Sequence, residues 1–305
     1  MKEAWRARIF SLTVVILMGQ AFCSAPRPIA EKRLQVAATI FPLVDIIRHV
    51  SGDFVKVMQI LPAGASPHTF DLTPAQVREL QEARIIFKIG GVDDWIDAIA
   101  NSLPQAVIVT LNRDIALQPL SAEGHVHSAV KDAYHEEFDP HYWLRADNGQ
   151  IIARQISEVL GKIFPGRAES FRMNFADFSR ELDSLHQELI EKLSGLKNNK
   201  MIVFHDAWRY FAAAYGLEIA AVFQSSPGRE PTPRELRDLY SLVKKYSFKI
   251  IFSEPQLPKA SIEPLLRDLG LQLVILDPLG GTDANDSYAR MLRRNALAIH
   301  RALER

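Results

Sequence analysis

The residues with the clearest capacity for chemistry are three histidines and one aspartate that lie directly after predicted strands or in the loops that follow them. A ligand of an α/β sheet usually lies beyond the carboxyl ends of its strands. Three neutral imidazoles and one carboxylate would suit a four-coordinate borderline metal such as zinc. A single histidine in such a place is more often a hydrogen-bonded structural residue, so the interpretation depends on all four side chains converging. The four candidates are His68, His141, His205 and Asp277.

The first half of the chain predicts an N-terminal α/β lobe over residues 34–164. Short β-rich runs alternate there with helical patterns, which favours a parallel sheet covered on both faces. The loop 112–140 interrupts this alternation without clear periodicity, and a loop of that length is usually functional or disordered. The predicted strands are 34–39, 55–60, 85–89 and 107–110, and the predicted helices are 42–50, 74–83 and 93–102.

A long connecting helix is predicted over residues 165–196. Its apolar residues recur at steps of three and four, which places them on one face of a helix. A helix of this length spans on the order of 40 Å, enough to bridge two lobes. The residues of that face are Phe171, Phe175, Phe178, Leu182, Leu185, Leu189 and Leu193.

A second alternating pattern predicts a C-terminal α/β lobe over residues 200–305. The predicted fold class is therefore α/β, with two lobes that each contain a mostly parallel sheet flanked by helices. One long rigid helix joins the lobes, and a metal site lies in the cleft between them. The predicted strands are 201–204, 219–222, 249–253 and 272–276, and the predicted helices are 207–215, 232–246, 259–269 and 287–303.

Four motifs resemble those of one family of metal receptors. They are Gly-Ala-Ser-Pro-His-Thr-Phe-Asp-Leu-Thr-Pro-Ala-Gln at 64–76, Asp-Pro-His-Tyr-Trp-Leu at 139–144, Phe-His-Asp-Ala-Trp-Arg-Tyr-Phe-Ala-Ala-Ala-Tyr-Gly-Leu at 204–217 and Leu-Asp-Pro-Leu-Gly at 276–280. In this order they resemble the metal-binding solute receptors of ABC importers, and most closely the ZnuA-like and TroA-like zinc-uptake branch. The resemblance runs from about residue 34 to the C-terminus.

The resemblance implies one buried metal site between two α/β lobes. Its ligands would be His68, His141, His205 and, as the less secure member, Asp277. Manganese-preferring relatives typically carry a carboxylate where His205 stands, so that histidine favours zinc. The implied function is a high-affinity zinc receptor, monomeric and without catalytic activity. It would deliver Zn²⁺, as cargo, to the permease of an ABC importer in the inner membrane.

Three other functions stay open at this point: a manganese receptor of the same type, a zinc-dependent hydrolase and a surface adhesin. A fourth protein ligand at Asp277 and the lack of a convincing general base argue against hydrolysis. Glu254 also follows a predicted strand and could lie near the metal, although local hydrogen bonding is the favoured interpretation.

The long loop carries histidines in a thin version of the histidine-rich loop of zinc receptors. A solvated loop is favoured over metal scavenging as their interpretation. These histidines are His125, His127 and His135.

The charge balance limits the class of ligand, and the N-terminal sequence indicates the cellular location of the protein. The chain has 36 basic and 36 acidic residues, so it lacks the basic excess of a nucleic-acid binder. A basic start followed by an apolar run at 9–18 predicts a secretory signal peptide at about 1–21 and a periplasmic protein. Cleavage after Ala21 is favoured over lipid attachment at Cys23, and this single cysteine excludes an intramolecular disulfide.

Overall fold

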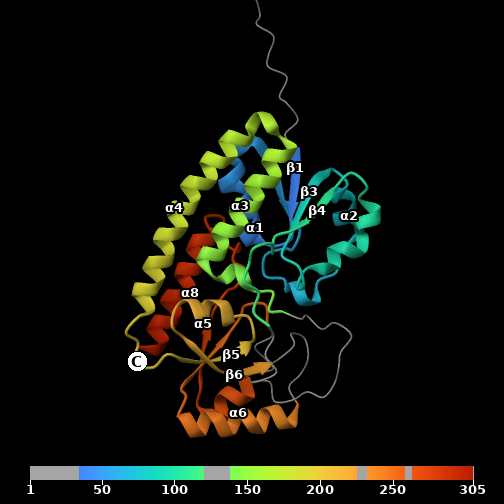
Figure 1. Ribbon diagram of the computed structural model, residues 1–305. Helices are drawn as coiled ribbons and strands as arrows, with labels where there is room; N and C mark the ends of the chain where they lie inside the picture. The colour runs from blue at the N-terminus through green and yellow to red at the C-terminus, as the bar shows by residue number, and fades with distance from the viewer. Residues whose placement is uncertain (1–33, 120–137, 225–231, 258–262, 305) are drawn as a thin grey trace, which may run out of the picture. The chain divides into compact units, whose positions relative to one another are not determined.

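Two parallel four-stranded sheets organise the chain in the computed structural model, which describes residues 34–119, 138–224, 232–257 and 263–304. The first sheet has the strand order β2-β1-β3-β4 and the second has the order β6-β5-β7-β8 (Figure 1). The strands of the first are β1 (Leu34–Ala38), β2 (Val55–Gln59), β3 (Ala83–Lys88) and β4 (Val107–Thr110). Those of the second are β5 (Lys200–His205), β6 (Glu218–Gln224), β7 (Ile250–Ser253) and β8 (Gln272–Ile275).

The helices lie between the strands in the sequence, as the alternating pattern predicts. The α-helices are α1 (Phe41–Ser51), α2 (Pro74–Leu80), α3 (Ala146–Ile163), α4 (Ala168–Leu193), α5 (Arg209–Ala214), α6 (Pro233–Tyr246), α7 (Glu263–Leu269) and α8 (Tyr288–Leu303). Short 3-10 helices are η1 (Gly52–Phe54), η2 (Pro67–Thr69), η3 (Asp94–Ser102), η4 (Tyr142–Leu144) and η5 (Pro165–Arg167). The predicted α/β fold with two parallel sheets and one long helix is confirmed.

Alternating side chains of the central strands enter different cores. In β5, Met201 and Val203 belong to one cluster of buried residues, whereas Ile202 and Phe204 belong to a second cluster. This is the two-residue period of a strand buried on both faces. In the first sheet, Ala37 of β1 likewise faces a third cluster of its own. Each sheet therefore has one face with a separate core.

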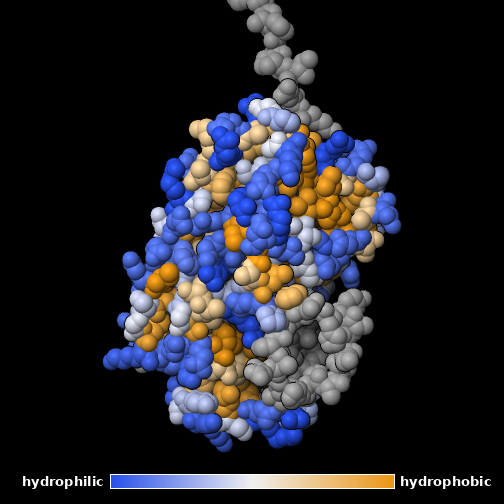
Figure 2. All heavy atoms as spheres, viewed as in Figure 1, coloured by the Kyte–Doolittle hydropathy of each residue, from blue (hydrophilic) through white to orange (hydrophobic). Residues whose placement is uncertain are grey.

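The remaining faces of the two sheets share one continuous core with α1, α3, α4 and α8. Helix α4 packs against α1 and α3, and α8, from the end of the chain, packs against α4 (Figure 1). The connection between the sheets is thus a layer of packed helices, in which α4 is one member. Hydrophilic side chains cover much of the surface along α3 and α4 (Figure 2), as expected of amphipathic helices.

Some element boundaries differ from those predicted. Helix α2 ends at Leu80 rather than at 83, because β3 already begins at Ala83. The predicted helix 93–102 is the 3-10 helix η3. In a 3-10 helix, residues three apart are eclipsed, so Asp94 and Asp97 lie on one side and both accept hydrogen bonds from Lys88 of β3.

Several sequence predictions lie outside the described residues. They are the signal peptide at 1–21, Cys23, and the loop histidines His125, His127 and His135. Among the helices that the structure does describe, none combines the length and the apolar character needed to cross a bilayer.

Candidate metal site

His68 is held in place by the loop that follows β2. The loop continues the sheet for two residues, with Ile60 and Leu61 donating backbone hydrogen bonds to Ala38 and Thr39. Pro67 then fixes the first turn of η2, and its carbonyl oxygen accepts a hydrogen bond of 3.1 Å from the indole Nε1 of Trp95. The backbone that leads into His68 is therefore held first by the sheet and then by the contact of Pro67 with Trp95.

His141 is fixed by a carboxylate two residues before it. The Oδ1 atom of Asp139 accepts hydrogen bonds from the backbone N–H of His141 at 2.9 Å and from its Nδ1 at 2.8 Å. Asp139 is fully buried, and its own N–H donates to the Gln118 carbonyl oxygen. Since a carboxylate oxygen accepts, Nδ1 of His141 carries the proton, and Nε2 is the nitrogen able to bind a metal.

His205 is the last residue of β5, and a second carboxylate orients it. Its Nδ1 lies 3.2 Å from both oxygens of Glu254, which follows β7, the neighbouring strand. The indole Nε1 of Trp208 also donates to Oε1 of Glu254 at 3.2 Å. The proton of His205 is therefore on Nδ1, and its Nε2 is the nitrogen able to bind a metal.

The three imidazoles come together, as expected from the sequence. One nitrogen from each of His68, His141 and His205 lies within 4.8 Å of the other two. The ring centroids are 4.8 Å apart for His68 and His205, 5.0 Å for His141 and His205, and 5.5 Å for His68 and His141. Zinc bound at about 2.0–2.1 Å to each nitrogen would set nitrogen–nitrogen distances of roughly 3.4 Å, so small side-chain movements would complete the geometry.

Burial keeps His68 in the neutral form that can bind a cation. It holds the pKa of His68 well below its usual value, and the neighbouring imidazoles His205 and His141 lower it further. The Nε2 atom of His68 is buried without a hydrogen-bond partner among the described residues. His141 and His205 are buried at 4% and 5% exposure. A metal ion would give Nε2 of His68 the partner that this buried polar atom otherwise lacks.

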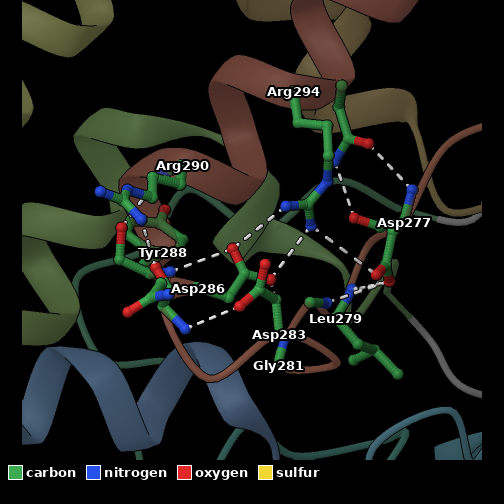
Figure 3. Close-up of polar contacts among 12 residues, drawn as sticks. Asp277, Leu279, Gly281, Asp283, Asp286, Tyr288, Arg290 and Arg294 are labelled. Atoms are coloured by element: carbon green, nitrogen blue, oxygen red, sulfur yellow. Dashed lines mark hydrogen bonds and ion pairs between the residues drawn. The ribbon is translucent and has the colours of Figure 1, made fainter.

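Asp277 follows β8 as predicted, but it is not one of the residues whose ligand atoms converge at this site. Its Oδ1 accepts hydrogen bonds from the backbone N–H groups of Leu279 at 3.1 Å and Gly280 at 3.0 Å. Its Oδ2 lies 3.8 Å from the guanidinium of Arg294. The side-chain amide of Asn295 pairs with both backbone polar groups of Asp277. Figure 3 shows Asp277 between the Leu279 backbone and Arg294.

Two carboxylates that contact the histidines were not assigned this role from sequence. Glu254 was expected to make local hydrogen bonds, and it instead orients His205 from a neighbouring strand. Asp139 could have been found from its place two residues before His141. At that spacing an aspartate side chain can accept a hydrogen bond from the backbone N–H two residues later, in an Asx-turn. The pocket at the three imidazoles is lined by Ser66, Pro67, His68, His141, Trp143, His205, Glu254, Gln256, Leu257, Pro278 and Leu279.

Comparisons with known proteins point to one family. The model of the family described as zinc-uptake complex component A, periplasmic, matches residues 36–302. The chain is 26% identical to the high-affinity zinc uptake system protein ZnuA of Brucella suis biovar 1, in a match covering 97% of this chain and 99% of ZnuA.

The chain is also similar to a longer zinc-binding protein. It is 27% identical over 279 residues to the zinc-binding lipoprotein AdcA of Streptococcus pneumoniae strain R6, which covers 88% of this chain and 56% of AdcA. This chain thus spans little more than half the length of AdcA. The crystal structure of the zinc-bound ZnuA-like domain of S. pneumoniae AdcA superposes with a TM-score of 0.73 at 25% identity, covering 90% of this chain and 100% of that domain.

Proposed function

The chain belongs to the family of periplasmic zinc-uptake components, and we propose that it is a receptor that binds one zinc ion through His68, His141 and His205. The observation that carries the proposal is the convergence of three imidazole nitrogens, from three separate segments, within 4.8 Å of one another. The names of the relatives, zinc-binding lipoprotein and high-affinity zinc uptake protein, support the same ligand. The ion is the cargo of this receptor, and its partner is the membrane permease of an ABC importer. We further propose that the receptor works as a monomer in the periplasm.

The donor set favours zinc over manganese. Imidazole nitrogens suit zinc, whereas manganese prefers carboxylate, carbonyl and water oxygens. The two carboxylates nearest to the histidines, Asp139 and Glu254, contact the Nδ1 atoms of His141 and His205. They therefore act on the imidazoles and leave the Nε2 atoms to bind the ion. We propose the three histidines as the direct protein ligands, with Asp277 outside the coordination sphere.

The same contacts favour a receptor over a hydrolase. A zinc hydrolase needs a general base within hydrogen-bond reach of a metal-bound water. Glu254 lines the pocket, but its Oε1 already accepts hydrogen bonds from Trp208 and His205. Its role in orienting His205 therefore competes with a role as a base, and we propose that the protein performs no chemistry on what it binds.

Calorimetric titration of the metal-free protein tests this function. We expect one tight zinc site per chain, which native mass spectrometry would count independently. Manganese, titrated in the same way, should bind much more weakly and be displaced by one equivalent of zinc. A chain that binds no zinc tightly, or that binds manganese more tightly than zinc, would contradict the proposal.

A further inference from the structure

Gln256 lies two residues after Glu254 and lines the pocket at the three histidines. Its side-chain Nε2 donates a hydrogen bond of 3.2 Å to Oδ1 of Asp277. A carboxylate oxygen that also accepts two backbone N–H groups can only face the NH₂ side of an amide. Asp277 therefore determines the orientation of the Gln256 amide, whose Nε2 is occupied by the hydrogen bond to Asp277.

The other branch of this amide, Oε1, is buried and has no hydrogen-bond partner among the described residues. Leaving an amide oxygen buried and unpaired costs about 1–3 kcal/mol. Such an atom in the lining of a pocket indicates that something bound in the pocket donates a hydrogen to it.

The two carboxylates closest to Gln256, Glu254 and Asp277, are already engaged. Both oxygens of Glu254 contact Nδ1 of His205, and Oε1 also accepts from Trp208. Asp277 accepts from Gln256, Leu279 and Gly280 through Oδ1, while Oδ2 faces Arg294 (Figure 3). Gln256 Oε1 is therefore the side-chain acceptor of this lining best placed to receive a new donor.

We propose that Gln256 positions a water molecule on the bound zinc, and that Asp277 acts on the metal through Gln256. This inference rests on the proposed zinc function. Three histidines supply three of the four ligands of a tetrahedral zinc ion, and a water as the fourth has hydrogens to donate. In the chain Asp277, Gln256, water, each hydrogen bond polarises the next and strengthens it in surroundings of low dielectric, here beside Leu257 and Leu279.

Cobalt(II)-substituted wild-type protein gives the first test, because its visible spectrum reports the ligands of the metal. Azide should replace an exchangeable water and change the spectrum in a saturable way. A spectrum that azide leaves unchanged would mean that the fourth ligand comes from the protein, and would overturn the inference. This arm needs no substitution, so it does not depend on the folding of any variant.

Gln256→Leu gives the second test, since leucine fills a similar volume without the acceptor. We expect zinc affinity to fall by about 10-fold, the usual lower bound for losing a group that supports a metal ligand. Azide should bind the cobalt form of Gln256→Leu several-fold more tightly, because the competing water is no longer held. The control is Gln187→Leu, the same change on the exposed face of α4, with both affinities unchanged. Unchanged affinities for Gln256→Leu would overturn the inference.

Asp277→Asn separates an indirect role from direct coordination. Asparagine keeps an oxygen that can accept from Leu279, Gly280 and Gln256, so zinc affinity should stay within about threefold of wild type if Asp277 acts through Gln256. A loss as large as that of a histidine variant would overturn the inference while leaving the receptor function intact. Absence of tight zinc binding to the wild type would instead overturn the proposed function itself.

Discussion

The indole Nε1 of Trp143 donates a hydrogen bond of 2.8 Å to the carbonyl oxygen of Pro278, which lies 135 residues further along the chain. Trp143 follows His141 by two residues, and Pro278 directly follows Asp277. The carbonyl oxygen of Trp143 in turn accepts a hydrogen bond from the hydroxyl of Tyr288, the first residue of α8. The segment that carries His141 is thus tied to the loop after β8 by buried contacts.

Replacing Trp143 by phenylalanine should lower the free energy of unfolding of the metal-free protein by about 1–3 kcal/mol. The ring would still fill the core, but the buried carbonyl oxygen of Pro278 would lose its donor. Urea denaturation followed by circular dichroism measures this. Tyr246→Phe, which removes a hydroxyl from an exposed ring, is the control and should change stability by less than about 0.5 kcal/mol. Equal losses in both variants would contradict a specific role for the hydrogen bond.

His68→Ala and His205→Ala should each weaken zinc binding by at least about 100-fold. The reason is that each removes one imidazole nitrogen from a site whose total binding energy is shared by few ligands. Competition with a chromogenic chelator gives the affinities. His300→Ala makes the same change near the end of α8, outside the site, and should bind zinc like the wild type. A histidine of the site that could be removed without loss would not be a ligand.

Glu254→Gln should reduce zinc affinity by about 10-fold while leaving the fold intact. Glutamine still offers an oxygen to Nδ1 of His205, but it withdraws the negative charge that makes the imidazole a better donor to the metal. The matched control is Glu218→Gln, which changes an exposed carboxylate paired with Lys200. Both affinities can be measured with the same chelator, and a loss shared by the control would point to a general effect of charge.

The metal-free protein should lose stability as pH falls through the range in which an ordinary imidazole gains its proton, about 6.5. Burial and the neighbouring histidines lower the pKa of His68 in the folded state, so the unfolded chain takes up a proton that the folded chain refuses. The contribution of His68 to the free energy of unfolding is therefore fully present above about pH 6.5. It is lost as the pH falls below that value, toward the lowered pKa of His68 in the folded state.

The slope of this loss is at most about 1.4 kcal/mol per pH unit for one proton. His68→Gln should flatten the dependence of urea midpoints on pH between 7 and 5, since glutamine does not titrate. A wild-type curve as flat as that of the variant would show that His68 is protonated equally in both states.

Much of the fold follows from the sequence because its signals are local. Buried parallel strands are short apolar runs and their connecting helices have an apolar face, as in α4, and neither pattern depends on distant residues. The approach of His68 and His205 to each other also follows from the sequence. His205 ends a strand of one parallel sheet and His68 lies in the loop after a strand of the other, on the side where ligands of such sheets gather.

Only the tertiary structure shows which partners the carboxylates near the histidines have. Asp277 follows its strand as predicted, but its carboxylate accepts from backbone groups two and three residues later and from Gln256, and its backbone pairs with Asn295 of α8. Glu254 reaches His205 across two neighbouring strands. Hydrogen-bond partners of this kind depend on distances between segments far apart in the chain, and no periodicity of the sequence records them.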